Sequence, residues 1–103
     1  MMEREGLVSA HQDQEVELVC KASGDDPIAV LWRKEGSELI AEPGRSAIAV
    51  IRQTQHIAST FRISNTKRSD SRRYECQASN PFGKSYYHIH LQIWGMLHSA
   101  NLC

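Results

Sequence analysis

The stretch that decides the fold of this chain is Asp70-Ser-Arg-Arg-Tyr74-Glu-Cys76. It comes after an earlier cysteine, Cys20, and a tryptophan, Trp32. The order Cys, Trp, Tyr, Cys at this spacing is typical of an all-β sandwich, in which a tryptophan packs between two sheets and a tyrosine anchors the turn before the second cysteine. The pattern predicts a binding module rather than an enzyme.

Length and charge limit the possible functions further. The 103 residues fit one domain. Twelve Lys and Arg balance twelve Asp and Glu, so the net charge gives no reason to expect nucleic acid or an anionic membrane as a partner. No run approaches the roughly 20 apolar residues that span a bilayer, and Met1–Gly6 lacks the apolar core of a signal peptide. We therefore expect no nucleic-acid partner and no direct membrane insertion.

Strands are predicted where apolar and polar residues alternate between turn residues. The alternating segments begin near Val16, Ile28, Ser46, Ile57, Tyr74 and Lys84, with a short one at Leu39-Ile40. In the last segment, Tyr87, Ile89, Leu91 and Ile93 are expected in the core, and Asn80-Pro-Phe-Gly83 predicts a hairpin before it.

The domain is expected to span residues 7–94, with an N-terminal extension at 1–6 and a disordered tail at 95–103. Only Leu7-Val-Ser-Ala10 precedes the strand that begins near Val16. The first strand is therefore expected to be short or missing, which would leave one sheet edge poorly covered.

A family resemblance rests on residues spread over 7–94. Cys20, Trp32, Asp70, Tyr74, Cys76, Ala78, Asn80 and Gly83 resemble the I-set immunoglobulin pattern. This resemblance implies an immunoglobulin-like sandwich of two antiparallel sheets with one inter-sheet disulfide, Cys20–Cys76. It also implies structural core roles for Trp32 and Tyr74, and an ion pair between Asp70 and Arg45.

A narrower resemblance is carried by Gly24–Ile28, Ala78–Gly83 and His90–Ile93, which are similar to a late immunoglobulin domain of the Down syndrome cell adhesion molecule (Dscam) family. It implies a neuronal cell-surface receptor with roles in homophilic adhesion, axon guidance and recognition. The domain would be a binding or spacer module beside other immunoglobulin or fibronectin type III domains. Its expected location is extracellular, in a plasma-membrane receptor ectodomain, so the chain would be part of a longer protein. The alternative is an intracellular sarcomeric or cytoskeletal immunoglobulin domain with reduced cysteines.

The predicted protein-binding face lies on the outward side of the strands near Trp32, Tyr74 and Lys84. Its residues are Arg33, Arg73, Glu75, Gln77, Tyr86, His88 and His90. Arginine and tyrosine are enriched where proteins meet. The alternative is an ordinary solvent-exposed sheet face.

No catalytic residue, cofactor or metal is expected. His88 and His90 share a strand face, but two ligands do not make a zinc site, and no nucleophile elbow or phosphate-binding loop is present. The basic cluster Lys67, Arg68, Arg72 and Arg73 is expected to be structural and solvated, with sulfated glycan binding as the alternative.

Two further residues depart from the I-set pattern. Arg72 stands where the pattern has a small residue and shares the inward parity of Tyr74. Its side chain must therefore either extend to water from the edge of the sandwich or strain the turn, and Arg72→Gly is expected to raise the melting temperature. Cys103 is the third cysteine and is expected to be an unpaired thiol, with an intermolecular disulfide as the alternative.

Overall fold

The computed structural model describes residues 4–95, which form eight strands and one short 3-10 helix. The elements are β1 (Arg4–His11), β2 (Val16–Ser23), β3 (Ala29–Lys34), β4 (Ser37–Glu38), β5 (Ser46–Gln53), β6 (His56–Ile63), η1 (Arg68–Asp70), β7 (Arg72–Asn80) and β8 (Gly83–Trp94). The expected disordered tail, from residue 96 onward, and Cys103 lie outside the described residues.

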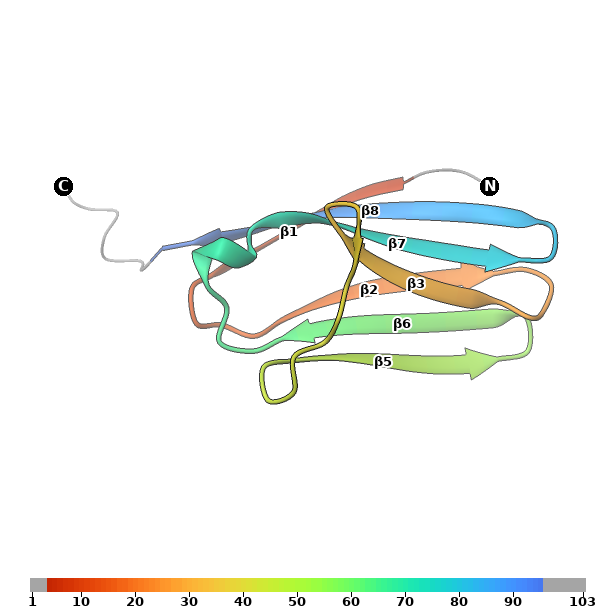
Figure 1. Ribbon diagram of the computed structural model, residues 1–103, viewed down its shortest axis with the longest axis horizontal. Helices are drawn as coiled ribbons and strands as arrows, with labels where there is room; N and C mark the ends of the chain where they lie inside the picture. The colour runs from red at the N-terminus through yellow and green to blue at the C-terminus, as the bar shows by residue number, and fades with distance from the viewer. Residues whose placement is uncertain (1–3, 96–103) are drawn as a thin grey trace.

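The strands form two sheets that pack face to face (Figure 1). One sheet has five strands in the order β1-β8-β7-β3-β4, and the other has three in the order β2-β6-β5. Every pair is antiparallel except β1 with β8. The predicted all-β, immunoglobulin-like sandwich is confirmed, with a parallel edge strand as its one exception to antiparallel pairing in the part described.

The core forms because apolar residues occupy every second position of the facing strands. On β2, Val16 and Leu18 are at most 6% exposed, whereas Glu17 between them is exposed. On β8, the expected core residues Ile89, Leu91 and Ile93 are buried, and Tyr87 packs against the same cluster. Alternation therefore assigns the inner face of both sheets correctly.

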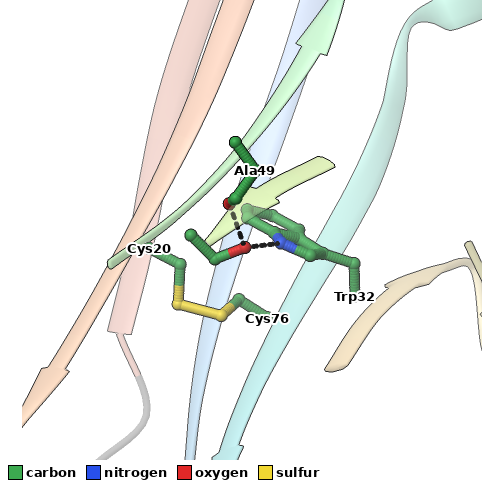
Figure 2. Close-up of a disulfide and its surroundings, with 5 residues drawn as sticks. Cys20, Trp32, Ala49 and Cys76 are labelled. Atoms are coloured by element: carbon green, nitrogen blue, oxygen red, sulfur yellow. Dashed lines mark hydrogen bonds between the residues drawn. A yellow bond between two sulfur atoms is a disulfide. The ribbon is translucent and has the colours of Figure 1, made fainter. Parts of the chain in front are cut away.

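A disulfide and a hydrogen-bonded serine join the two sheets at the centre of this core (Figure 2). Cys20 on β2 bonds to Cys76 on β7, 56 residues later in the chain. Trp32 Nε1 donates to Ser59 Oγ at 2.8 Å, and Ser59 Oγ donates to the Ala49 carbonyl at 3.2 Å. The hydroxyl thus satisfies an indole N–H that is buried with the rest of Trp32.

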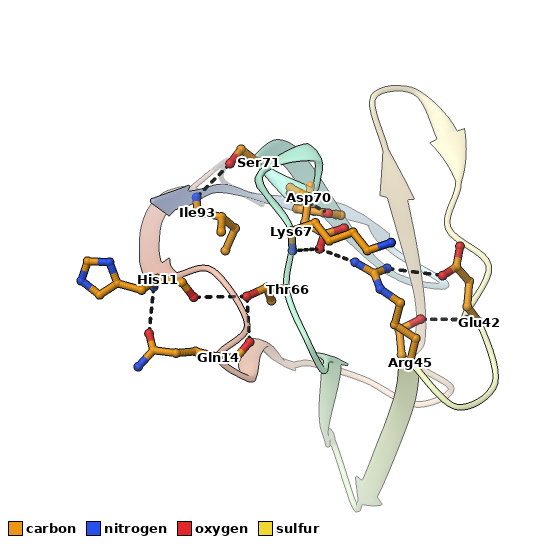
Figure 3. A network of polar contacts seen from close by, with 11 residues as sticks. His11, Gln14, Glu42, Arg45, Thr66, Lys67, Asp70, Ser71 and Ile93 are labelled. Carbon is orange, nitrogen blue, oxygen red and sulfur yellow. Dashed lines mark hydrogen bonds and ion pairs between the residues drawn. The ribbon is translucent and has the colours of Figure 1, made fainter. Parts of the chain in front are cut away.

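The Asp70 carboxylate forms hydrogen bonds and an ion pair that hold η1, the turn between β6 and β7, in place (Figure 3). It accepts a hydrogen bond from the Lys67 backbone N–H at 2.8 Å and forms an ion pair with Arg45, as the I-set resemblance implies. The Asp70 carbonyl accepts the Tyr74 hydroxyl at 3.0 Å, which is the geometry of a tyrosine corner. Burial, and next the negative charge of Asp70, raise the pKa of Tyr74 to about 12.

The N-terminal strand differs from expectation. It is neither short nor missing, because β1 runs over eight residues from Arg4 to His11. It begins three residues before the domain start predicted at residue 7, so part of the expected extension belongs to the sandwich. Since β1 joins β8 in the five-stranded sheet, β2 is an edge strand of the other sheet. The expectation of an edge left uncovered by a missing first strand is therefore wrong in its premise.

The short strand after Trp32 was predicted two residues too late. Glu35 and Gly36, with φ of 50° and 87°, make a tight turn after Lys34, so Ser37 pairs back with Lys34 at once. Leu39 follows the two-residue strand β4 and is buried as a loop residue, with its N–H donating to the Trp32 carbonyl.

Of the two expected solutions for Arg72, the structure shows the side chain that extends from the end of the sandwich rather than one that strains the turn. Its side chain is 37% exposed, and its guanidinium lies 2.6 Å from the Glu35 carboxylate. Arg72 is the first residue of β7 and lies at the end of the sandwich. Its long side chain is therefore not forced into the core and reaches Glu35 in the β3–β4 turn. The expected gain in stability from Arg72→Gly therefore loses its basis.

Candidate protein-binding face

The outer face of the five-stranded sheet carries all of the residues predicted to bind protein. They are Arg33 on β3, Arg73, Glu75 and Gln77 on β7, and Tyr86, His88 and His90 on β8. Their neighbours Trp32 and Tyr74 are buried in the core, and side chains alternate along a strand. The predicted residues therefore point away from the core and share one surface, which we call the outer face.

The pairing register sets the predicted residues side by side. Glu75 lies between Arg33 and His88 on the two neighbouring strands. Gln77 lies opposite Tyr86. Residues that were distant in the sequence therefore form three adjacent rows, the third being Arg73 opposite His90.

The middle row alternates acid and base across the sheet. In register, the row runs Glu38 on β4, Arg33 on β3, Glu75 on β7 and His88 on β8. The Glu75 Oε2 atom lies 3.5 Å from His88 Nε2. Residues of opposite charge directly across a ladder each contribute roughly 0.2–1 kcal/mol. Such a row also gives the face a fixed pattern that a partner of complementary charge can match.

The outer face is packed rather than fully solvated. His88 is only 8% exposed although it points away from the core, and Arg33, Glu75 and Tyr86 are partly buried. Two nitrogen atoms, His88 Nδ1 and Arg33 Nε, are buried without a hydrogen-bond partner among residues 4–95. Side chains that are already held in place lose less conformational entropy when a partner binds.

The histidines do not form a metal centre in the described part of the chain. His88 is buried beside Glu75, and His90 is exposed on the same face. Within residues 4–95 there is no cluster of three or more His, Cys, Asp or Glu side chains able to hold a metal ion. A zinc site requires three or four such ligands.

An open cleft lies at one end of the sandwich and is lined by residues of β2, β5, β6, β7 and β8. Its walls include Ala22, Ile57, Ala78 and Ser85, and none of its lining residues is a carboxylate.

The four residues of the basic cluster, Lys67, Arg68, Arg72 and Arg73, have different surroundings. Arg72 forms an ion pair with Glu35, and the backbone N–H of Lys67 donates a hydrogen bond to the Asp70 carboxylate. Arg68 and Arg73 are exposed. The ion pair of Arg72 favours the structural interpretation of the cluster over glycan binding.

Two residues that matter to these sites were not predicted. Glu38 extends the charged row, and its position would have followed from placing the short strand at residues 37–38. Ser59 is completely buried as the partner of Trp32, and only its parity with Phe61 signals that it points inward.

No described helix is both long and apolar enough to cross a membrane.

Comparison with curated proteins finds relatives that are much longer than this chain. The chain is 32% identical to human hemicentin-1 over 94 residues, which is 91% of this chain and 2% of hemicentin-1. It is 33% identical to the human cell adhesion molecule DSCAM over 84 residues, which is 82% of this chain and 4% of DSCAM. The predicted resemblance to the Dscam family is thus confirmed, although the chain spans only a few hundredths of these relatives.

Solved structures show the same fold. A titin fragment, Titin-A168169, superposes with a TM-score of 0.76 at 21% identity, covering 87% of this chain and 45% of the fragment. The model of the immunoglobulin I-set domain matches residues 4–93. I-set domains are binding and structural modules, not enzymes. The sequence motifs, the fold and the family match together show that the chain belongs to the immunoglobulin I-set domain family.

Proposed function

We propose that this domain is a protein-recognition module in the ectodomain of a cell-surface adhesion receptor. The observation that carries the proposal is the outer face, where Arg33, Glu75, Tyr86 and His88 form a continuous, partly buried surface of charged and aromatic side chains. Interfaces are enriched in arginine and tyrosine, and ordered charges give specificity.

Two further observations support an extracellular adhesion role. The Cys20–Cys76 disulfide is of the kind that persists in oxidising compartments, which favours this role over the intracellular alternative with reduced cysteines. DSCAM, at 33% identity, is described as a cell adhesion molecule. The Dscam-family resemblance extends the proposal to neuronal recognition and axon guidance, with neighbouring immunoglobulin or fibronectin type III domains and protein partners that include like domains.

The proposal is tested with a fluorescent tetramer of the full chain applied to cultured neurons and to a non-neuronal cell line. Tetramers raise the apparent affinity of a weak interaction by orders of magnitude. We expect binding to neurons that falls several-fold with Arg73→Glu or Tyr86→Ala, because both change the exposed part of the outer face. Ser23→Ala, an exposed position on β2 of the other sheet, is the matched control and should bind normally.

Three results would count against the proposal. Equal staining of both cell types would remove the neuronal assignment. Binding that survives both substitutions would move the site away from the outer face. A tetramer that stains no cells would indicate a spacer between other domains.

A further inference from the structure

The strand β5 is an exposed sheet edge that is apolar on both faces. It pairs with β6 only, and it lies at the margin of the sandwich in Figure 1. Its apolar residues Ile48, Val50 and Ile51 are 36%, 46% and 65% exposed. Ile48 and Val50 point to the inner face, opposite buried Phe61 and Ser59, but the facing sheet ends in the two-residue β4 and does not cover them.

The backbone of β5 offers hydrogen-bonding groups along this edge. The Ser64 N–H donates to the Arg45 carbonyl at 2.8 Å, which identifies Arg45–Ser64 as a hydrogen-bonded pair of the β5–β6 ladder. Such pairs alternate along an antiparallel ladder. The N–H and carbonyl groups of Ile48, Val50 and Arg52 therefore point away from β6, toward the open edge.

Natural sheets usually protect such an edge, and β5 has only one of the common devices, the inward-pointing charge of Arg52, whose guanidinium donates to the Ile28 carbonyl at 2.6 Å. Protection also comes from lysine, proline, bulges or a covering segment. The strand Ser46-Ala-Ile-Ala-Val-Ile-Arg-Gln53 contains no lysine and no proline, and its register with β6 is continuous over all eight residues. Its one charge is Arg52, near the end of the strand. An edge with so little protection is a template for pairing with another strand.

We propose that β5 pairs antiparallel with β5 of a second copy of this chain, joining two three-stranded sheets into one of six strands. A two-fold axis at Ala49 places Ile48 of each copy opposite Val50 of the other and Ala47 opposite Ile51. These pairs are apolar on both faces, and β-branched pairs favour sheets.

Charge also suits a second copy. In this register the two Arg52 residues lie at opposite ends of the new ladder, so they do not repel each other. Each Arg52 lies opposite the uncharged Ser46, so the register places no like charges directly across the new ladder.

The pairing is expected to be weak for the free domain. It involves one strand and a few half-exposed side chains, which places it among small, transient interfaces, so we expect a dissociation constant on the order of 10⁻⁵ M. This edge belongs to the three-stranded sheet, whereas the proposed recognition surface belongs to the other sheet, so failure of one proposal leaves the other intact.

Sedimentation velocity of the full chain carrying Cys103→Ser tests the proposal, over roughly two decades of concentration around the expected dissociation constant. We expect a monomer–dimer equilibrium whose dissociation constant rises at least about tenfold with Val50→Lys, because an edge lysine blocks pairing. Phe82→Lys is the matched control, since Phe82 is 80% exposed at the β7–β8 hairpin, and it should dimerise normally.

Cysteine cross-linking tests the register independently and does not rely on the lysine variant folding. Ala49 meets itself at the axis in a non-hydrogen-bonded pair, with Cα atoms about 4.5 Å apart, which suits a disulfide. Ala49→Cys should form a covalent dimer on mild oxidation, whereas Ala47→Cys should not. The proposal is overturned by a monomer at every concentration, by a dimer that survives Val50→Lys, or by equal cross-linking at positions 47 and 49.

Discussion

Replacing Ser59 with alanine tests whether one buried hydroxyl helps to hold the two sheets together. Ser59 is completely buried, accepts a hydrogen bond from Trp32 Nε1 at 2.8 Å and donates one to the Ala49 carbonyl at 3.2 Å. Alanine removes the acceptor and leaves the indole N–H buried without a partner, which costs about 1–3 kcal/mol. The Ala49 carbonyl loses less, because Ala49 is also part of the β5–β6 ladder.

The expected loss in the free energy of unfolding is therefore about 2 kcal/mol, which corresponds to a melting temperature lower by roughly 10 °C in a domain of this size. Urea denaturation should show a lower midpoint with an unchanged slope, because the surface exposed on unfolding is the same. Ser23→Ala makes the same chemical change at an exposed position of β2 and should stay within about 0.5 kcal/mol of the parent.

The assignment of this loss to the indole is checked by a double-mutant cycle. In a Trp32→Phe background the N–H is gone, so Ser59→Ala should cost clearly less than it does in the parent. The ¹H–¹⁵N signal of Trp32 Nε1 should also move in Ser59→Ala. A loss under about 0.5 kcal/mol with an unmoved indole signal would refute the reasoning, and so would an equal loss in both backgrounds.

Three other predictions concern the end of the sandwich formed by η1 and the start of β7. Asp70→Ala should lower the free energy of unfolding by about 2 kcal/mol by urea denaturation, because it removes the less exposed of the two carboxylates paired with Arg45 and the acceptor of the Lys67 N–H; no change would show that the ion pair is dispensable. Because the folded-state pKa of Tyr74 is raised to about 12 from 10.0, the unfolded chain loses the proton first, so stability should fall by up to about 2 kcal/mol as pH rises from 10 to 12. Tyr74→Phe should abolish that alkaline loss in thermal melts, and a loss that persists in it would contradict the assignment. Arg72→Gly should lower the melting temperature by several degrees, since it removes the Glu35 ion pair and places glycine in a strand, and an unchanged or higher value would restore the idea of a strained arginine.

Much of the fold and of the outer face could be predicted because both depend on local alternation. Inward parity along β8 follows from Tyr87, Ile89 and Leu91, and outward parity of His88 and His90 follows with it. The hairpin at Asn80–Gly83 was predictable as well, because Asn80 Oδ1 accepts the Phe82 and Gly83 N–H groups within four residues of chain.

Errors occurred where the outcome depends on contacts between distant segments. Arg72 carries the inward parity of its strand, but Glu35, 37 residues away, draws its side chain to the surface. The position of β4 was missed because a two-residue turn at Glu35 and Gly36 needs positive φ at both residues, which Glu seldom adopts. From the sequence, Ser59 resembles any other strand residue, because its hydrogen bond with Trp32 joins segments 27 residues apart.

The sequence by itself determined the side of each strand that faces the core, because periodicity is a property of the chain, and its resemblance to the I-set pattern implied the sandwich and the cysteine pair. Only the tertiary structure decided that β1 pairs with β8, leaving β2 at an edge, and that β5 lies uncovered opposite the two-residue β4. It also decided that His88 is buried on an outward face. The reason is physical: parity states which way a side chain points, but burial depends on which segments, distant in sequence, come to lie over it.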